Sequence, residues 1–82
     1  MAKLLIVKVG ERSKTAVRVQ EVLTQHGCSI KTRLGLHEFA PECGERDEGL
    51  IILEVMGSNE EIGKLREALE AVESVKTVLV EI

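Results

Sequence analysis

Two neighbouring segments, Ile30-Lys-Thr-Arg-Leu-Gly-Leu-His37 and Gly49-Leu-Ile-Ile-Leu-Glu-Val-Met56, decide the fold class of this 82-residue chain. The first alternates apolar and polar side chains, which is typical of a strand with one face on a core. The second is apolar almost throughout, which indicates a strand inside a sheet. The segment between them, Glu38–Glu48, is polar and contains Pro41 and Gly44, so it predicts a long hairpin loop. We therefore expect the two segments to pair as antiparallel strands.

A helical pattern precedes this pair of strands, and another follows it. From Arg12 to His26 apolar residues recur at helical spacing, with Ser13 as the predicted N-cap and Gly27 as the predicted left-handed stop. The stretch Ser58-Asn-Glu-Glu61 has the form of a capping box, so it predicts the start of a second helix with one apolar face. The predicted apolar face consists of Ile62, Leu65, Leu69 and Val72.

Strand-like segments lie near both ends of the chain. Lys3–Val9 has large apolar residues on both faces, and Val75–Ile82 is rich in β-branched residues. The order strand, helix, strand, strand, helix, strand predicts an α+β fold, the ferredoxin-like βαββαβ sandwich, whose four-stranded antiparallel sheet has both helices on one face. Right-handed crossovers place the first and third strands at the centre of the sheet. Residues 1–82 are predicted to form a single domain.

The other face of such a sheet has no helix to cover it. The apolar residues predicted on that open face are Leu4, Ile6, Leu50, Ile52 and Met56. Because contiguous apolar surface of this kind seldom stays exposed in a soluble protein, we expect a homodimer or homotetramer that forms through the sheet.

The predicted strand register places three candidate ligand-binding residues, Arg33, Gly35 and His37, on the same open face. Arg33 then lies opposite Glu54, where it forms either a cross-strand ion pair or an anchor for an anionic ligand within a subunit interface. Gly35 lies opposite Ile52, and it lets another backbone approach closely under either interpretation. We therefore predict a small-ligand site lined by Arg33, Gly35 and His37.

His37 and Cys43 suit a transition metal such as nickel, copper, zinc or iron, because imidazole and thiolate are soft ligands. Two ligands make an incomplete site, so a second subunit or other side chains would have to add to it. The other candidate ligands are His26, Cys28, Glu38 and Glu42. The His-x5-Cys spacing matches no zinc-finger or redox motif. A divalent transition metal is therefore one hypothesis, and ordinary surface and loop positions are the other.

Composition argues against several classes of function. The 11 basic and 14 acidic residues give a net charge of −3 without a basic patch, and there is one Phe and neither Trp nor Tyr, so we expect no nucleic-acid binding. The apolar run Leu4–Val7 is too short for a membrane helix or signal peptide, and two cysteines suggest no secreted framework, so we expect a cytoplasmic protein. No nucleophile with a base and no phosphate-binding loop is recognisable, so we expect no enzyme.

Over nearly its whole length, the chain resembles the small family of iron-only hydrogenase system regulators. The shared features are an Arg-x-Gly strand (Arg33–Gly35), a polar loop, an apolar strand (Gly49–Met56) and an Ile-Gly-x-Leu helix (Ile62–Leu65). That family is similar to ACT-type regulatory domains and to the C-terminal domain of nickel-responsive repressors, which bind effectors at subunit interfaces. The resemblance implies a single ACT-like regulatory domain.

Two features depart from these relatives. The nickel-responsive domain has a His-x-His strand followed five residues later by a cysteine, whereas this chain has Gly35-Leu-His37 followed by Cys43. Gly35 therefore stands where the first histidine ligand would be. The turn Val9-Gly10-Glu11 also lacks the acidic-then-glycine sequence of many ACT-type domains.

The leading hypothesis is a non-catalytic regulatory module that oligomerises through its sheet and senses a small ligand, in transcriptional or hydrogenase-system regulation. One alternative is a transition-metal-binding module that uses His37 and Cys43. A second alternative is a structural protein-interaction domain without a ligand.

Overall fold

The computed structural model describes residues 2–36 and 48–82. Within them the elements follow in the order β1 (Lys3–Val9), α1 (Arg12–Gln25), a short 3₁₀ turn η1 (Gly27–Ser29), β2 (Ile30–Leu36), β3 (Gly49–Val55), α2 (Asn59–Glu70) and β4 (Val75–Glu81). The predicted βαββαβ order is confirmed. Each predicted strand and helix is present, with ends that differ from the prediction by a residue or two.

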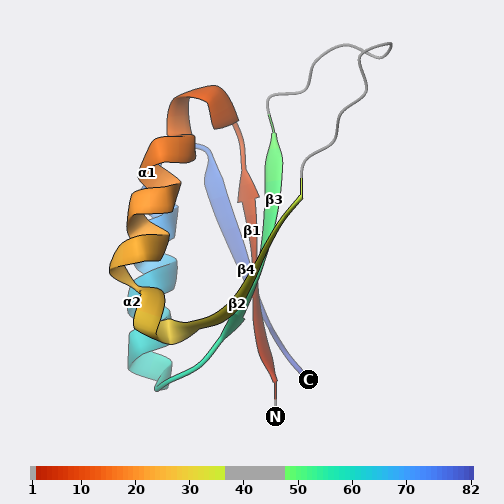
Figure 1. Cartoon of the computed structure of the whole chain (residues 1–82), viewed down its shortest axis with the longest axis vertical. Helices are drawn as coiled ribbons and strands as arrows, with labels where there is room; N and C mark the ends of the chain where they lie inside the picture. The colour runs from red at the N-terminus through yellow and green to blue at the C-terminus, as the bar shows by residue number, and fades with distance from the viewer. Residues whose placement is uncertain (1, 37–47) are drawn as a thin grey trace.

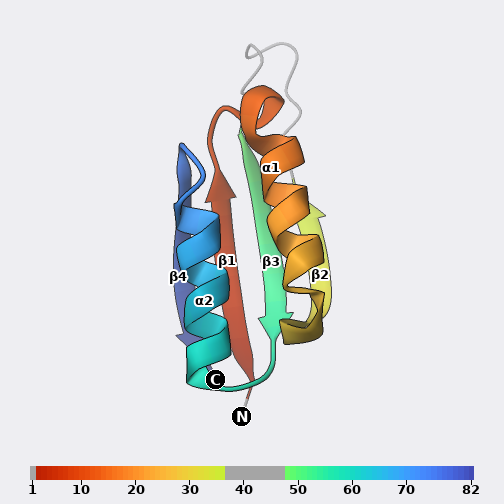
Figure 2. The same cartoon turned by 90° about the vertical axis from the view of Figure 1, so that its left-hand side faces the viewer.

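The four strands form one antiparallel sheet in the order β2-β3-β1-β4, with β1 and β3 at the centre as predicted. Both helices lie on one face of the sheet (Figure 1). Figure 2 shows α1 over β2 and β3, and α2 over β1 and β4. The two ends of the described chain lie side by side, because Ala2 and Ile82 exchange backbone hydrogen bonds of 3.0 and 2.8 Å. Neither helix is long and apolar enough to cross a membrane.

The hydrophobic core lies between the sheet and the two helices. It consists of Leu5, Val7 and Val9 of β1, Val19, Val22 and Leu23 of α1, Leu53 and Val55 of β3, Ile62, Leu65 and Leu69 of α2, and Val72 and Val75. Burial of one such side chain stabilises the fold by about 1.5–3 kcal/mol. The helical spacing of apolar residues predicted for both helices therefore corresponds to faces that point into the core.

The start of α2 confirms the predicted capping box. The Ser58 hydroxyl accepts a hydrogen bond of 3.1 Å from the backbone N–H of Glu61, and the Glu61 carboxylate accepts one of 3.4 Å from the N–H of Ser58. These bonds satisfy N–H groups that the first turn of a helix leaves without a partner. The glutamates in this first turn also interact favourably with the helix dipole.

Both predicted ends of α1 differ in the structure. The N-cap is Glu11, in a left-handed conformation with φ 49°, rather than Ser13. At the other end the helix stops at Gln25, but Gly27 is not left-handed, because the chain continues directly into η1 with a hydrogen bond from Ser29 N–H to the His26 carbonyl (2.9 Å). A 3₁₀ turn thus ends the helix without a residue of positive φ.

Candidate functional site

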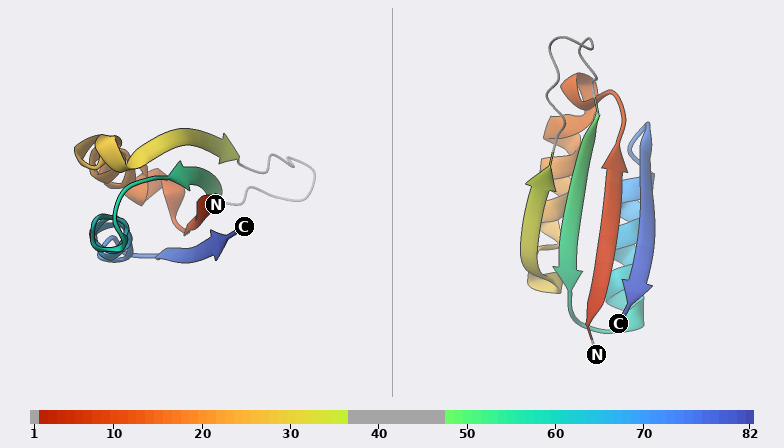
Figure 3. Two further views of the ribbon diagram at one scale, coloured as in Figure 1. Left: turned by 90° about the horizontal axis from the view of Figure 1, so that it is seen from below. Right: turned by 90° about the vertical axis from the view of Figure 1, so that its right-hand side faces the viewer.

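No element of the described chain covers the sheet face opposite the helices (Figure 3, right). Strand register arranges the residues of this open face in three rows from β2 to β4. The rows are Leu34, Ile52, Ile6 and Val78 at the centre, Thr32, Glu54, Leu4 and Val80 on one side, and Leu36, Leu50, Lys8 and Lys76 on the other. Adjacent strands lie about 4.8 Å apart, so the apolar side chains of the central row form a continuous surface.

Most of the apolar residues predicted for this open face are confirmed there. Leu50 and Ile52 of β3 share the face with the residues of β1, whereas Met56 lies just beyond β3 and is 51% exposed. The outer strands add apolar residues that were not predicted on this face. Leu34 (53% exposed) and Val78 (58% exposed) lie in the central row, and Leu36 and Val80 lie in the rows beside it. The apolar patch therefore extends across all four strands.

Charges lie at opposite ends of the open face. Lys8 pairs with Lys76 across β1 and β4, so two ammonium groups share one end. Glu54 lies toward the other end, where its carboxylate is 3.9 Å from Lys31 Nζ and 3.5 Å from the Thr32 hydroxyl. The face is thus positive at one end and close to neutral at the other.

A β-bulge at the start of β2 corrects the predicted placement of the candidate ligand-binding residues. Ile30 pairs with Val55 and packs against the core, but the register then shifts, and Thr32 pairs with Glu54. One extra residue in a strand moves every following side chain to the opposite face. Arg33 therefore lies opposite Leu53 on the helix side of the sheet. The prediction that it faces Glu54 on the open side was wrong.

Gly35 moves with Arg33 to the helix side, where it pairs with Ile51 instead of Ile52. The Arg33 guanidinium donates a hydrogen bond to the side-chain oxygen of Gln20 on α1. Arg33 and Gly35, which were predicted to line a subunit interface, therefore both lie on the side of the sheet that carries α1, and both are exposed.

A hollow of about 240 Å³ lies beside Gly35, between α1 and the β2–β3 edge of the sheet. Its lining residues are Val9, Ala16, Val19, Gln20, Gly35, Leu36, Gly49, Leu50 and Ile51. Gly35 and Gly49 lie on adjacent strands, and Ala16 of α1 is also small, so these three residues contribute little side-chain volume to the lining. The walls are apolar, and the Gln20 amide is their polar side chain.

The other predicted site residues lie outside the described part of the chain or apart from one another. His37 and Cys43, the predicted metal ligands, fall in the segment 37–47, outside the described residues. Residues 2–36 and 48–82 hold no cluster of three metal-ligating side chains. Cys28, a further candidate metal ligand, is exposed, whereas the neighbouring Ser29 is buried. Metal binding at His37 and Cys43 stays a prediction.

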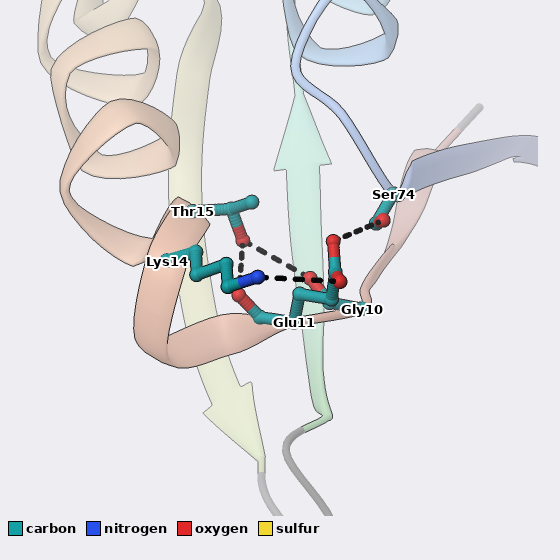
Figure 4. Close-up of polar contacts among 5 residues, drawn as sticks. All are labelled: Gly10, Glu11, Lys14, Thr15 and Ser74. Carbon is teal, nitrogen blue, oxygen red and sulfur yellow. Dashed lines mark hydrogen bonds and ion pairs between the residues drawn. The ribbon is translucent and has the colours of Figure 1, made fainter.

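The turn between β1 and α1 has a structural role (Figure 4). Glu11 accepts a hydrogen bond of 3.0 Å from the Ser74 hydroxyl and lies 3.9 Å from Lys14 Nζ, while the buried Thr15 hydroxyl donates to the Gly10 and Glu11 carbonyls. A Cβ added at Gly10 would lie 3.1 Å from the Ser74 carbonyl oxygen, so a glycine suits the close approach of the two turns. The hydrogen bond between Glu11 and Ser74 therefore links the β1–α1 turn to the turn that precedes β4.

No protein-family model and no curated protein matches the chain. Among solved structures, the uncharacterized protein TM1266 from Thermotoga maritima is similar with 25% identity and a TM-score of 0.81, over 96% of this chain and 92% of that one. CPII from Thiomonas intermedia K12, a nitrogen regulatory PII-like protein bound to ADP, AMP and bicarbonate, is similar with 20% identity and a TM-score of 0.59, over 99% and 91%. The PII-like protein CutA from Nostoc sp. PCC 7120 has 15% identity and a TM-score of 0.50, over 98% and 80%.

These similarities support the ferredoxin-like fold independently of the sequence pattern. Each covers nearly the whole of the present chain, so the likeness extends to the complete order of strands and helices and not to one shared motif. Fold alone does not assign a ligand. The site must be argued from the residues of this chain.

Of the residues that line the hollow, the sequence predicted only Gly35 as a site residue, and the most instructive omissions are Gln20 and Gly49. Gln20 has no special spacing in the sequence, and its role becomes visible only when α1 is placed over Arg33. Gly49 could have been found from the sequence, because it and Gly35 are both glycines within predicted strands. With the bulge in place, both lie on the helix side of the sheet, beside the same cavity.

Proposed function

We propose that this chain is a non-catalytic regulatory module that self-associates through the open face of its sheet and responds to a small ligand. The observation that carries the proposal is the apolar surface that crosses all four strands. Its central row contains Leu34 and Val78, each more than half exposed. A protein in solution lowers its free energy when it removes such a surface from water.

The structural similarities support the regulatory part of the proposal. CPII has the same fold over nearly its full length, and it binds ADP, AMP and bicarbonate. The resemblance carried by Arg33–Gly35 and Ile62–Leu65 extends the proposal to transcriptional or hydrogenase-system regulation. The ligand-sensing role is inferred from this shared architecture, and it is open to direct test.

The occupant that we propose for the open face is a second copy of the chain. Two identical sheets that pack face to face with aligned strands are related by a two-fold axis between them. If the two-fold axis ran parallel to the strands, Lys8 and Lys76 of both copies would lie at the same end of the interface and repel one another. An axis across the strands brings each lysine pair to the end that carries the partner's carboxylate at position 54, which avoids like-charge repulsion. We therefore propose the arrangement with reversed strands.

The test of self-association compares two valines. Val78→Glu places a carboxylate in the central row of the open face, whereas Val17→Glu places one on the outer surface of α1, where the valine is 72% exposed. We expect Val78→Glu to weaken self-association at least about tenfold, because burial of an unpaired charge is costly. Val17→Glu should leave it unchanged. Sedimentation equilibrium measures both.

Equal association constants for the two variants and the unmodified chain would contradict an interface on the sheet. The ligand-sensing role is tested by thermal unfolding in the presence of amino acids, nucleotides and carboxylates, since a ligand that binds only the folded state raises the melting temperature. A self-associating protein that responds to none of these compounds would instead be a structural interaction domain.

A further inference from the structure

We propose that the hollow between α1 and the β2–β3 edge binds the apolar part of a small carboxylic acid, with Arg33 and Gln20 holding the carboxylate. This inference rests on the proposed ligand-sensing function, and it names the site and the chemical class of the ligand. Most of its lining lies on the helix side of the sheet, and only Leu36 and Leu50 also belong to the proposed subunit interface.

The first support is the empty space at Gly35. Gly35 is exposed, and among residues 2–36 and 48–82 no atom lies within 4 Å of a Cβ placed at this position, so no described backbone or side chain requires a glycine. The φ angle of Gly35 is not positive either, so the backbone conformation suits any residue. The glycine therefore leaves room beside the hollow without serving the turn chemistry or close packing that usually explains a glycine in a strand.

The second support is the guanidinium of Arg33. Among residues 2–36 and 48–82, no carboxylate lies within ion-pair distance of it, and its recorded side-chain partner is the neutral amide of Gln20. Gln20 also lines the hollow, so the Arg33 guanidinium that it binds lies next to the apolar walls. A guanidinium binds a carboxylate with two parallel hydrogen bonds, and the Gln20 amide nitrogen can donate another.

Size and charge define the class of ligand. A volume of about 240 Å³ is below the range of about 300–1,000 Å³ that is typical of sites for drug-sized molecules, so the ligand is a small acid. In the described part of the chain, the residues that line the hollow include no carboxylate that could pair with an ammonium group. A short branched carboxylic or 2-oxo acid therefore fits the hollow better than the corresponding amino acid does.

The probe for this proposal is 4-methylpentanoate, which has a branched apolar end and one carboxylate. Titration of the full chain, followed by the NMR shifts of backbone amides in α1, β2 and β3, should show saturable binding. Leucine carries an additional ammonium group, and 4-methylpentan-1-ol lacks the carboxylate, so both should bind at least about tenfold more weakly. Absence of saturable shifts with the acid, or equal binding of the alcohol, would overturn the proposal.

Matched variants locate the binding. Arg33→Gln should raise the dissociation constant of 4-methylpentanoate about tenfold, whereas Arg18→Gln, elsewhere on the surface of α1, should leave it unchanged. Gly35→Val should abolish binding, because Gly35 lines the hollow and valine adds side-chain volume beside it, while valine suits a strand. Gly63→Ala, in α2, is the control for added side-chain volume, since its Cβ also meets nothing within 4 Å.

A thermal unfolding curve for Gly35→Val separates lost binding from lost folding, and the milder Gly35→Ala provides a second test if valine unfolds the chain. Binding that survives both Gly35 variants in folded protein would overturn the proposed site. The result is independent of self-association. An oligomer without carboxylate binding contradicts this inference alone, whereas a monomer that binds the acid in the hollow contradicts the proposed interface alone.

Discussion

The two faces of the sheet come from the same four strands but differ in what covers them. On the helix side, neighbouring central-strand residues such as Leu5 and Leu53 are fully buried. On the open side, Ile6 and Ile52 are the immediate sequence neighbours of these residues, and both remain partly accessible. The near-continuous apolar character of β1 and β3 thus has two causes. One face forms the core of this chain, and the other face is available to a second copy.

The largest expected effect distinguishes the two faces at adjacent residues of β1. Leu5→Ala removes a fully buried side chain and should lower the free energy of unfolding by about 2–5 kcal/mol. Ile6→Ala should lower it much less when the protein is dilute, because this side chain is buried mainly on association. Urea unfolding at low and high protein concentration measures both. An equal loss for the two variants in dilute protein would mean that the chain itself covers the open face.

Charge reversal on the open face tests the orientation of the two copies. With reversed strands, Lys8→Glu brings a new carboxylate to the end that carries the partner's carboxylate at position 54, so it should weaken association about three- to tenfold. Combining it with Glu54→Lys should restore much of the lost affinity. Sedimentation equilibrium at low salt gives the constants. Tighter association of Lys8→Glu alone would instead favour the axis along the strands, since the change relieves a cluster of lysines.

The smallest expected effect concerns the β-bulge at the start of β2. This bulge determines on which face of the sheet each following side chain of β2 lies. Deletion of Lys31 should regularise the pairing of Ile30 and Thr32 with β3 and keep the contact between Arg33 and Gln20. We expect a stability change of about 1 kcal/mol or less, because the lost ion pair with Glu54 is largely exposed. Nuclear Overhauser contacts between Arg33 and Gln20 report the outcome. Their loss would mean that the extra residue does not set the register.

The sequence predicted the architecture well, because local signals and the global fold agree. Alternation in β2, the continuous apolar run in β3 and the Ser58–Glu61 capping box each indicate their element without help from tertiary contacts. The ends of α1 were less predictable. Its N-cap residue, Glu11, contacts Ser74, which is distant in sequence. Its C-terminal end is followed by a 3₁₀ turn that no single residue type indicates.

The candidate site was predicted only in part. Arg33 and Gly35 were identified as site residues from their types and spacing, but both were placed on the wrong face. A bulge has no clear sequence signal here, since Lys31 looks like an ordinary outward residue of a strand. Gln20 was missed, because its importance arises from the packing of α1 over β2. The hypotheses for His37 and Cys43 concern residues outside the described part of the chain.

The central claim is that a second copy of the chain covers the open face of the sheet. The most direct test is the mass of the unmodified protein in solution, measured by sedimentation equilibrium over a dilution series. We predict a particle of at least about twice the chain mass that dissociates on dilution. A particle of one chain mass at every concentration, with the side chains of Leu34 and Val78 still accessible to solvent in side-chain labelling experiments, would contradict the account.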